Sequence, residues 1–182
     1  MARLPAIDPG QLSTDDKAIL DKIVAVRPGA ATGGPFAILM HRPKLADRAA
    51  ALEDYFRESG STLSGADREL IVLATVRETG ARYPWVRHEI RAAEEGVRPE
   101  ALEIVRAQGS TEKLTERERA FVDLARELVR THGLSDEQFN RALKTLGEDT
   151  LIEAVALAGH YTLVSFIANG FAIAPPDGAR SF

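Results

Sequence analysis

Glu69 and His88 are the two side chains in this sequence with the best case for proton-transfer chemistry. A carboxylate that accepts a hydrogen bond from one imidazole nitrogen fixes the ring tautomer, and the other nitrogen can then move a proton to or from a substrate. At 100° per residue, Glu69 lies within an apolar helical stripe, flanked by Val72 and Leu73. A buried carboxylate must find a partner or take up a proton, so Glu69 is a candidate acid or base.

Both residues also have a structural interpretation, which their spacing leaves open. Glu69 could form a buried ion pair with Arg68 or Arg77. His88 is predicted at the edge of the buried face of its helix. The structural alternative is a histidine at the protein surface or at the rim of the core, without a catalytic role. Glu89, the next residue, is predicted as a second carboxylate that points inward.

The other candidate residues do not complete a known motif. The run HEIRA at 88–92 begins like a zincin helix but has alanine where the second zinc-binding histidine is needed. A metal triad of Glu69, His88 and His160 has no supporting ligand spacing, so we expect no metal site. His160 and Tyr161 lie in an apolar segment, where they are either hydrogen-bonded core residues or residues that line a pocket.

The composition indicates a soluble globular domain. The chain has 182 residues, of which 45% are apolar and 27% charged, and its net charge is −4. This balance is not that of a disordered chain or of a general nucleic-acid binder. Cysteine is absent, which excludes disulfides and thiolate nucleophiles and makes the cytoplasm the expected compartment. The N-terminus has no apolar segment of the kind found in secretory signals.

Helical periodicity recurs along the chain and strand-like alternation does not, so we predict an all-α fold of about seven to eight helices. The predicted helices cover residues 13–26, 43–58, 64–80, 84–96, 99–107, 115–131, 135–146 and 149–173. The glycines and prolines at 28–35 are predicted as a loop, because the Gly-Lys-Ser/Thr of a phosphate-binding loop does not follow them.

The segment 154–174 contains no charged residue and is long enough to span a bilayer. It nevertheless contains polar residues such as His160 and Asn169, and no cluster of Lys or Arg flanks it. We therefore expect a helix buried in the domain core or at a subunit interface, and we predict neither a membrane nor a nucleic acid as a partner.

Three stretches of the sequence resemble the carboxymuconolactone decarboxylase family, whose superfamily includes the AhpD-type alkylhydroperoxidases. They are RELIVL at 68–73, GARYPWVRH at 80–88 and GHYTLV at 159–164. The resemblance implies a compact AhpD-like bundle at 35–174. Residues 1–34 are predicted to pack on it as a helix and a Gly/Pro loop, and 175–182 are predicted as a mobile tail, because Pro175 and Pro176 end the regular structure. The resemblance also implies homotrimers or homohexamers, with the last helix buried between subunits, and no cofactor.

The sequence departs from both branches of this superfamily. In the peroxidase branch, a glutamate and a histidine nineteen positions apart serve a Cys-x-x-Cys pair, and Glu69 and His88 keep that separation. The two cysteine positions are Ala81 and Pro84, which excludes thiol-based peroxide reduction. The decarboxylase branch typically has Tyr-Glu-Trp where this sequence has YPW at 83–85, so its usual carboxylate is missing too.

We therefore predict a cofactor-free lyase or decarboxylase-like enzyme that acts on a small carboxylate- or lactone-bearing molecule. Glu69 and His88 are its predicted catalytic residues. The predicted substrate-binding residues are Tyr83, Trp85, Arg87, Arg91, His160 and Tyr161. Of these, Arg87 or Arg91 would bind a substrate carboxylate through two parallel hydrogen bonds. The alternative is a non-catalytic ligand-binding or scaffold member of the family that has lost the redox cysteines.

Overall fold

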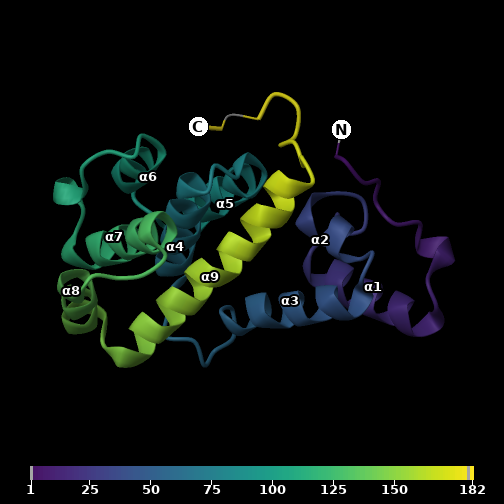
Figure 1. Ribbon diagram of the computed structural model, residues 1–182, viewed down its shortest axis with the longest axis horizontal. Helices are drawn as coiled ribbons and strands as arrows, with labels where there is room; N and C mark the ends of the chain where they lie inside the picture. The colour runs from purple at the N-terminus through teal and green to yellow at the C-terminus, as the bar shows by residue number, and fades with distance from the viewer. Residues whose placement is uncertain (1, 180) are drawn as a thin grey trace.

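A computed structural model of the chain describes residues 2–179 and 181–182, and these form an all-helical fold (Figure 1). The helices are α1 (Thr14–Val26), α2 (Gly34–Leu39), α3 (Pro43–Tyr55), α4 (Gly65–Glu78), α5 (Arg82–Glu94), α6 (Pro99–Arg106), α7 (Glu116–Thr131), α8 (Asp136–Leu146) and α9 (Glu148–Gly170). Short 3₁₀ turns occur at Pro9–Gln11 and Thr111–Lys113. The predicted all-α fold class is confirmed.

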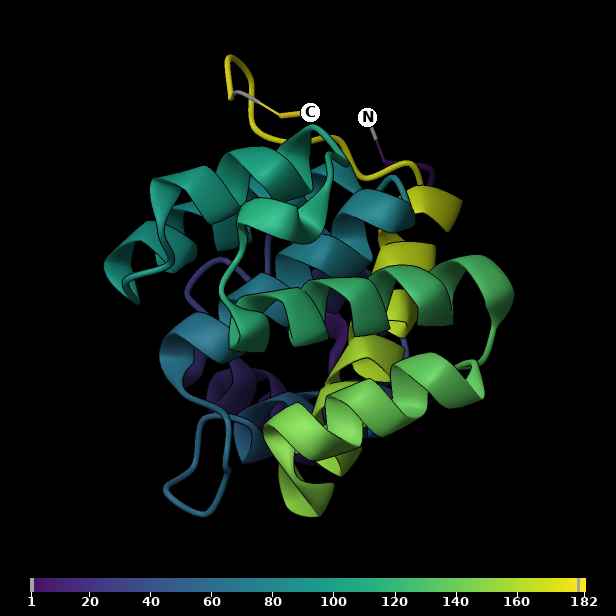
Figure 2. The same cartoon turned by 90° about the vertical axis from the view of Figure 1, so that its left-hand side faces the viewer.

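The central helix is α4, which packs against α5, α7 and α9. It begins with a capping box, in which Ser64 accepts from the Asp67 amide and Asp67 accepts from the Ser64 amide. Every residue of α4 from Arg68 to Val76 is buried. Figure 2 shows α7 and α8 covering the side of the molecule that faces the viewer. Side chains of α4 are therefore enclosed by other helices, which explains the burial of Glu69.

A tight connection places α5 directly against α4. Gly80, with φ +68°, and the extended Ala81 reverse the chain, and α5 begins at Arg82, two residues before the predicted start. Pro84 is tolerated in the first turn, because the amides there have no partner within the helix. The short turn brings the α5 face that carries His88 against the α4 stripe that carries Glu69.

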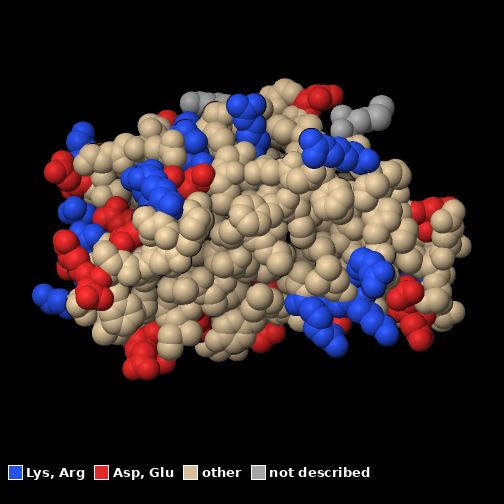
Figure 3. All heavy atoms as spheres, in the orientation of Figure 1, with Lys and Arg blue, Asp and Glu red and all other residues tan. Residues whose placement is uncertain are grey.

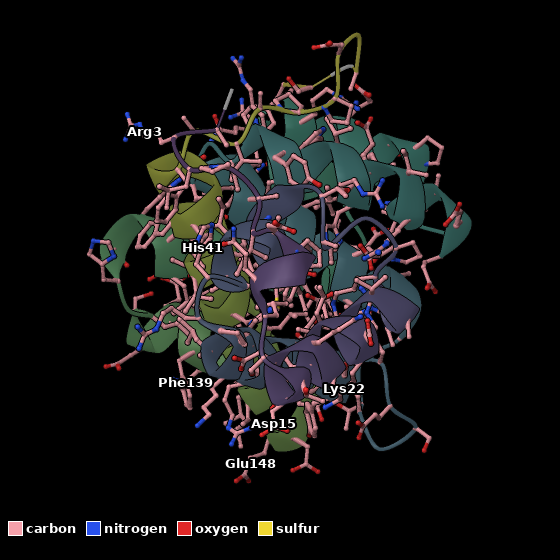
Figure 4. All side chains as sticks on the ribbon, turned by 90° about the vertical axis from the view of Figure 1, so that its right-hand side faces the viewer. Arg3, Asp15, Lys22, His41, Phe139 and Glu148 are labelled. Atoms are coloured by element: carbon pink, nitrogen blue, oxygen red, sulfur yellow. The ribbon has the colours of Figure 1, made fainter. Side chains whose placement is uncertain are left out.

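The N-terminal helices form a second, smaller apolar core. α1, α2 and α3 share it through residues such as Leu20, Phe36 and Met40, and Ile167 of α9 packs against it. Figure 4 shows α1 lying over this side of the molecule, with Asp15 and Lys22 on its surface. The sequence indicates no helix at α2, because six residues are too few to show a helical period.

Gly34 begins α2 in a backbone conformation that favours glycine. Its φ is +75°, and a Cβ at this position would lie 2.6 Å from the hydroxyl oxygen of Tyr83. We expect Gly34→Ala to lower the free energy of unfolding by about 1–3 kcal/mol, because alanine is strained at positive φ and Tyr83 must move. Denaturant unfolding followed by circular dichroism measures the change.

Gly133→Ala is the matched control, because its φ is not positive and a Cβ there would meet nothing within 4 Å. We expect a change of less than about 0.5 kcal/mol for this variant. Equal losses at the two glycines would show that the Gly34 conformation is not constrained.

The long apolar helix α9 is a core helix of this fold. It ends at Gly170, three residues before the predicted end. By length and composition alone, α9 could cross a membrane. In the structure, however, 56% of its most apolar 18-residue stretch is buried inside the protein. It contacts α2, α3, α4 and α5, so it lies between the N-terminal helices and the α4–α5 pair (Figure 1).

Candidate active site

The carboxylate of Glu69 and the imidazole of His88 are in direct contact. Glu69 Oε2 lies 2.6 Å from His88 Nδ1. Glu69 is completely buried and His88 is 5% exposed, so His88 lies deeper than the predicted edge of its helix face. So short a contact is typical of a charge-assisted hydrogen bond in which Nδ1–H donates to the carboxylate. Nε2 is then the nitrogen left for a substrate.

Arg68 makes the other contact to Glu69. Its Nε lies 3.5 Å from Glu69 Oε1, and its Nη2 donates to Glu95 at 3.0 Å. Arg77, the alternative ion-pair partner, donates to the Arg106 carbonyl oxygen instead. Each carboxylate oxygen of Glu69 therefore has its own partner. The ion pair with Arg68 and the contact with His88 are both present.

These contacts decide the charge of Glu69. Burial by itself raises the pKa of Glu69, but the hydrogen bond from His88 and the positive charges nearby, including Arg57 and Arg68, outweigh burial and lower that pKa. Glu69 is therefore ionised at neutral pH, where it acts as a hydrogen-bond acceptor for His88 and does not itself donate a proton.

His88 lines a cavity of about 300 Å³ between the N-terminal helices, α5 and α9. Arg87 and Arg91 line it as well, one helical turn apart on the α5 face that carries His88. Neither arginine has an ion-pair partner among the described residues. The cavity therefore combines an oriented imidazole with two positive charges that are available to an anion.

The structure brings together Tyr83, Arg87, Arg91 and Tyr161 from the predicted substrate-binding set, since all four line the cavity. Tyr161 meets the His88 ring edge-on at 4.9 Å between ring centroids. Burial and the nearby carboxylates raise the pKa of Tyr161 well above its usual value, so this phenol stays protonated.

Trp85 and Glu89 point away from the cavity, and both expectations for them are corrected. The indole Nε1 of Trp85 donates to Glu89 at 3.1 Å, and Glu89 also binds Arg106. The Trp85 ring packs edge-on against Phe182, so the end of the predicted mobile tail lies on α5. Positions 85 and 89 share an α5 face that is turned away from the one carrying His88.

His160 does not line the cavity directly. Its ring lies behind Tyr161, edge-on at 5.3 Å, and its Nε2 faces the carboxylate of Glu53 at 3.8 Å. The Tyr161 ring contacts both His88 and His160, which does not support a triad with Glu69 around one metal ion. Among the described residues, no group of three or more potential side-chain ligands could hold a metal ion.

Glu53 of α3 lines the cavity as well, although it is not among the residues predicted from the sequence. It is 8% exposed, and its Oε1 lies 3.6 Å from both Arg27 Nε and Arg57 Nη2. Burial raises the pKa of Glu53, but its contact with His160 and the positive charges of Arg27 and Arg57 outweigh burial and lower the pKa to about 2. The cavity lining therefore includes an ionised carboxylate on its N-terminal side.

Glu53 should make the stability of the fold depend on pH in the acid range. Its pKa is lowered from 4.5 to about 2 by folding, so the unfolded chain takes up a proton first as the pH falls. The stabilisation is complete above about pH 4.5 and is lost toward pH 2, a difference of about 3 kcal/mol. We expect the free energy of unfolding of Glu53→Gln to fall less steeply than that of the wild type in this window.

Denaturant unfolding at stepped pH values measures both profiles. Glu58→Gln replaces an exposed glutamate that closely follows α3 and serves as the control, with a profile parallel to that of the wild type. Parallel profiles for Glu53→Gln and the wild type would show that Glu53 is not held ionised by the fold.

Residues 43–127 match the carboxymuconolactone decarboxylase family. This segment contains both Glu69 and His88, whereas α9 lies outside it. No curated protein matches the sequence.

Several solved structures have the same fold. An alkylhydroperoxidase AhpD core protein from Ralstonia eutropha, described as an uncharacterized peroxidase-related protein, is 21% identical, with 97% of this chain and 93% of that chain covered and a TM-score of 0.78. A peroxidase-related protein from a Silicibacter species is 15% identical, with coverage of 96% and 93% and a TM-score of 0.75. The debrominase Bmp8, in complex with 2,3,4-tribromopyrrole, is 15% identical, with coverage of 95% and 91% and a TM-score of 0.67.

Proposed function

The chain belongs, over residues 43–127, to the carboxymuconolactone decarboxylase family, and on this premise we propose that it is a cofactor-free enzyme that transfers protons on a small carboxylate- or lactone-bearing molecule. The observation that carries the proposal is the 2.6 Å contact between Glu69 and His88, with His88 on the wall of a cavity. A buried carboxylate that orients an imidazole toward a cavity is the arrangement of a general acid–base pair.

The proposed reaction assigns a role to each of these side chains. Arg87 and Arg91 bind a substrate carboxylate, and Nε2 of His88 exchanges a proton with the reacting carbon. In a decarboxylation, the imidazolium protonates the carbanion or enolate that remains after CO₂ leaves. In an isomerisation, Nε2 removes a proton from one carbon and returns it to another. In both cases the Glu69 carboxylate stabilises the imidazolium form.

This chemistry needs no thiol, which matches a sequence without cysteine. The similarity to peroxidase-related structures lies at or below 21% identity and concerns the fold. A cysteine-free protein suits a reducing compartment, and we place this one in the cytoplasm.

A substrate screen in D₂O tests the proposal. The purified protein is incubated with a panel of small carboxylic and lactone acids, without added metal or cofactor, and NMR follows CO₂ loss, double-bond shifts and deuterium incorporation. We expect at least one compound to react with the wild type and not with His88→Gln. A panel that does not react would favour the non-catalytic, ligand-binding alternative.

We also propose that the protein is a homo-oligomer, a homotrimer or homohexamer, in which α9 contacts a second copy. Its exposed residues Ile152, Ala156, Gly159, Leu163 and Phe166 are spaced alternately by four and three positions. This spacing is typical of helices that pair along one seam, and the small residues in its middle allow a close approach. Figure 3 shows few charged residues over this face of the molecule.

Phe166→Glu should dissociate this oligomer. Phe166 is 67% exposed in the single chain, and a charge there would be buried without a partner at the seam. We expect the wild type to sediment as an oligomer and the variant to sediment as a monomer or a smaller species. Ile90→Glu, on α5, is a control of similar exposure, at 57%, and should keep the wild-type size. A monomeric wild type would contradict the proposal.

A further inference from the structure

A second cleft lies next to the candidate active site, on the other side of Tyr83. Its volume is about 270 Å³, and it lies between the N-terminal segment, α2 and the chain that follows α9. The Arg3 amide donates to the Phe171 carbonyl oxygen at 2.8 Å, which holds two of these segments together. The residues that line this cleft and not the active-site cavity are all apolar, among them Leu4 and Ile38. We call it the apolar cleft.

Tyr83 separates the apolar cleft from the active-site cavity. The residues that line both spaces are Thr32, Gly33, Gly34 and Tyr83. Among them only Tyr83 has a large side chain. Its hydroxyl end reaches from α5 to Gly34, where it lies 2.6 Å from the position that a Cβ would occupy. The two spaces are therefore adjacent, and the Tyr83 ring is the main barrier between them.

The spacing along α5 aligns this barrier with the two arginines of the cavity. Tyr83, Arg87 and Arg91 follow one another at intervals of four positions, so they lie along one side of the helix. Each interval corresponds to about 6 Å along the helix axis. A carboxylate bound by Arg87 and Arg91 therefore lies one to two helical turns from Tyr83.

The cavity lining favours the Tyr83 end for the rest of an apolar ligand. Pro84 follows Tyr83 directly, and Pro35 of α2 lies on the facing wall, next to the glycine that Tyr83 contacts. The wall formed by α3 carries the ionised Glu53 beside the Arg27 guanidinium. Charged groups that lose water against an apolar chain disfavour its binding, so we expect such a chain to extend along the apolar wall toward Tyr83.

We propose that the cavity and the apolar cleft are two compartments of one binding groove, and that Tyr83 determines the length of the carboxylic acid that the groove accepts. In the wild type, the ring confines the ligand to the active-site compartment, next to His88. The inference rests on the proposed function at one point, the carboxylate at Arg87 and Arg91. It requires binding only, and no turnover.

Calorimetric titration with straight-chain acids, from butanoate to decanoate, tests this role without any reaction. Each added CH₂ group that is buried should tighten binding about fourfold. For the wild type, we expect this gain to stop at the chain length that reaches Tyr83. For Tyr83→Ala, the gain should continue into the apolar cleft, so that decanoate binds the variant at least about tenfold more tightly than the wild type. Butanoate should bind both proteins equally well.

Tyr83→Phe is the matched control. The Tyr83 hydroxyl makes no hydrogen bond within the described part of the chain, so phenylalanine keeps the barrier and should keep the wild-type length limit. Tyr83→Leu carries the test if Tyr83→Ala does not fold, because leucine is too short to reach Gly34. Arg87→Gln should weaken all the acids by a similar factor and leave the length limit unchanged.

Leu4→Asp in the Tyr83→Ala background locates the longer chains. Leu4 is 40% exposed and lines the apolar cleft but not the active-site cavity. A carboxylate at this position would lose water against an apolar chain. We therefore expect the added affinity for decanoate to shrink, while the affinity for butanoate stays the same.

Three results would overturn the inference. One is a wild type whose affinity rises through the whole series. Another is a Tyr83→Ala variant, or Tyr83→Leu in its place, with the length limit of the wild type, and the third is a series in which no acid binds either protein. A limit that moves in the variant without turnover in the substrate screen would leave the inference standing and contradict only the catalytic proposal. Turnover with an unmoved limit would contradict only the inference.

Discussion

His88→Gln should reduce turnover of a substrate found in the screen by roughly 10²- to 10⁴-fold, the usual contribution of a positioned acid–base group. Glutamine keeps an amide N–H that can donate to the Glu69 carboxylate, so the buried charge retains a partner and the fold survives. The amide cannot take up a proton at neutral pH, however, so the exchange assigned to Nε2 is lost. The measurement is kcat with the wild-type substrate at constant pH, with KM expected to change far less.

Glu69→Gln should lose activity as well, because a neutral amide neither fixes the Nδ1–H tautomer as strongly nor stabilises the imidazolium. His41→Gln is the control, since His41 contacts the Pro5 carbonyl oxygen and does not line this cavity. It should keep wild-type kcat. A His88→Gln variant as active as His41→Gln would show that the reaction does not pass through His88.

His88→Leu should destabilise the fold by about 3–5 kcal/mol, the usual cost of leaving a buried charge without its partner. Glu69 is completely buried and Arg68 reaches it only at 3.5 Å, so one carboxylate oxygen would lose its donor without access to water. Denaturant unfolding at neutral pH gives the change in the free energy of unfolding.

The double variant Glu69→Met/His88→Leu separates this explanation from a simple packing defect. Removing both polar partners in favour of apolar side chains is often neutral or stabilising, so the double variant should recover most of the stability lost by His88→Leu, while remaining inactive. If the double variant is as unstable as the single one, the loss comes from packing around His88 and not from an unpaired Glu69.

The Glu69–His88 pair could be predicted from the sequence because two independent signals agree on it. Glu69 interrupts an apolar helical stripe, and the nineteen-residue separation from His88 matches a family pattern. Helix ends were predictable where capping residues and prolines mark them, as Ser64 does for α4. Such local signals do not depend on how distant segments pack.

Other parts of the site depend on tertiary packing or were overlooked. Glu53 follows Ala46, Ala49 and Ala50 at the spacing of a buried stripe, so the test that identified Glu69 could have found it. By contrast, no local pattern indicates that Arg27, at the end of α1, reaches the cavity, or that Trp85 packs against Phe182. The direction of an aromatic side chain in a helix that is buried on several sides is set by its neighbours.

Nitrogen NMR of the histidine side chains tests the central claim most directly, because it reports which ring nitrogens carry protons. With His88 assigned through the His88→Gln spectrum, we predict a protonated Nδ1 with a strongly deshielded proton, and a clear shift of that signal in Glu69→Gln. An unprotonated Nδ1, or ring signals that Glu69→Gln leaves unchanged, would contradict the Glu69–His88 proton relay.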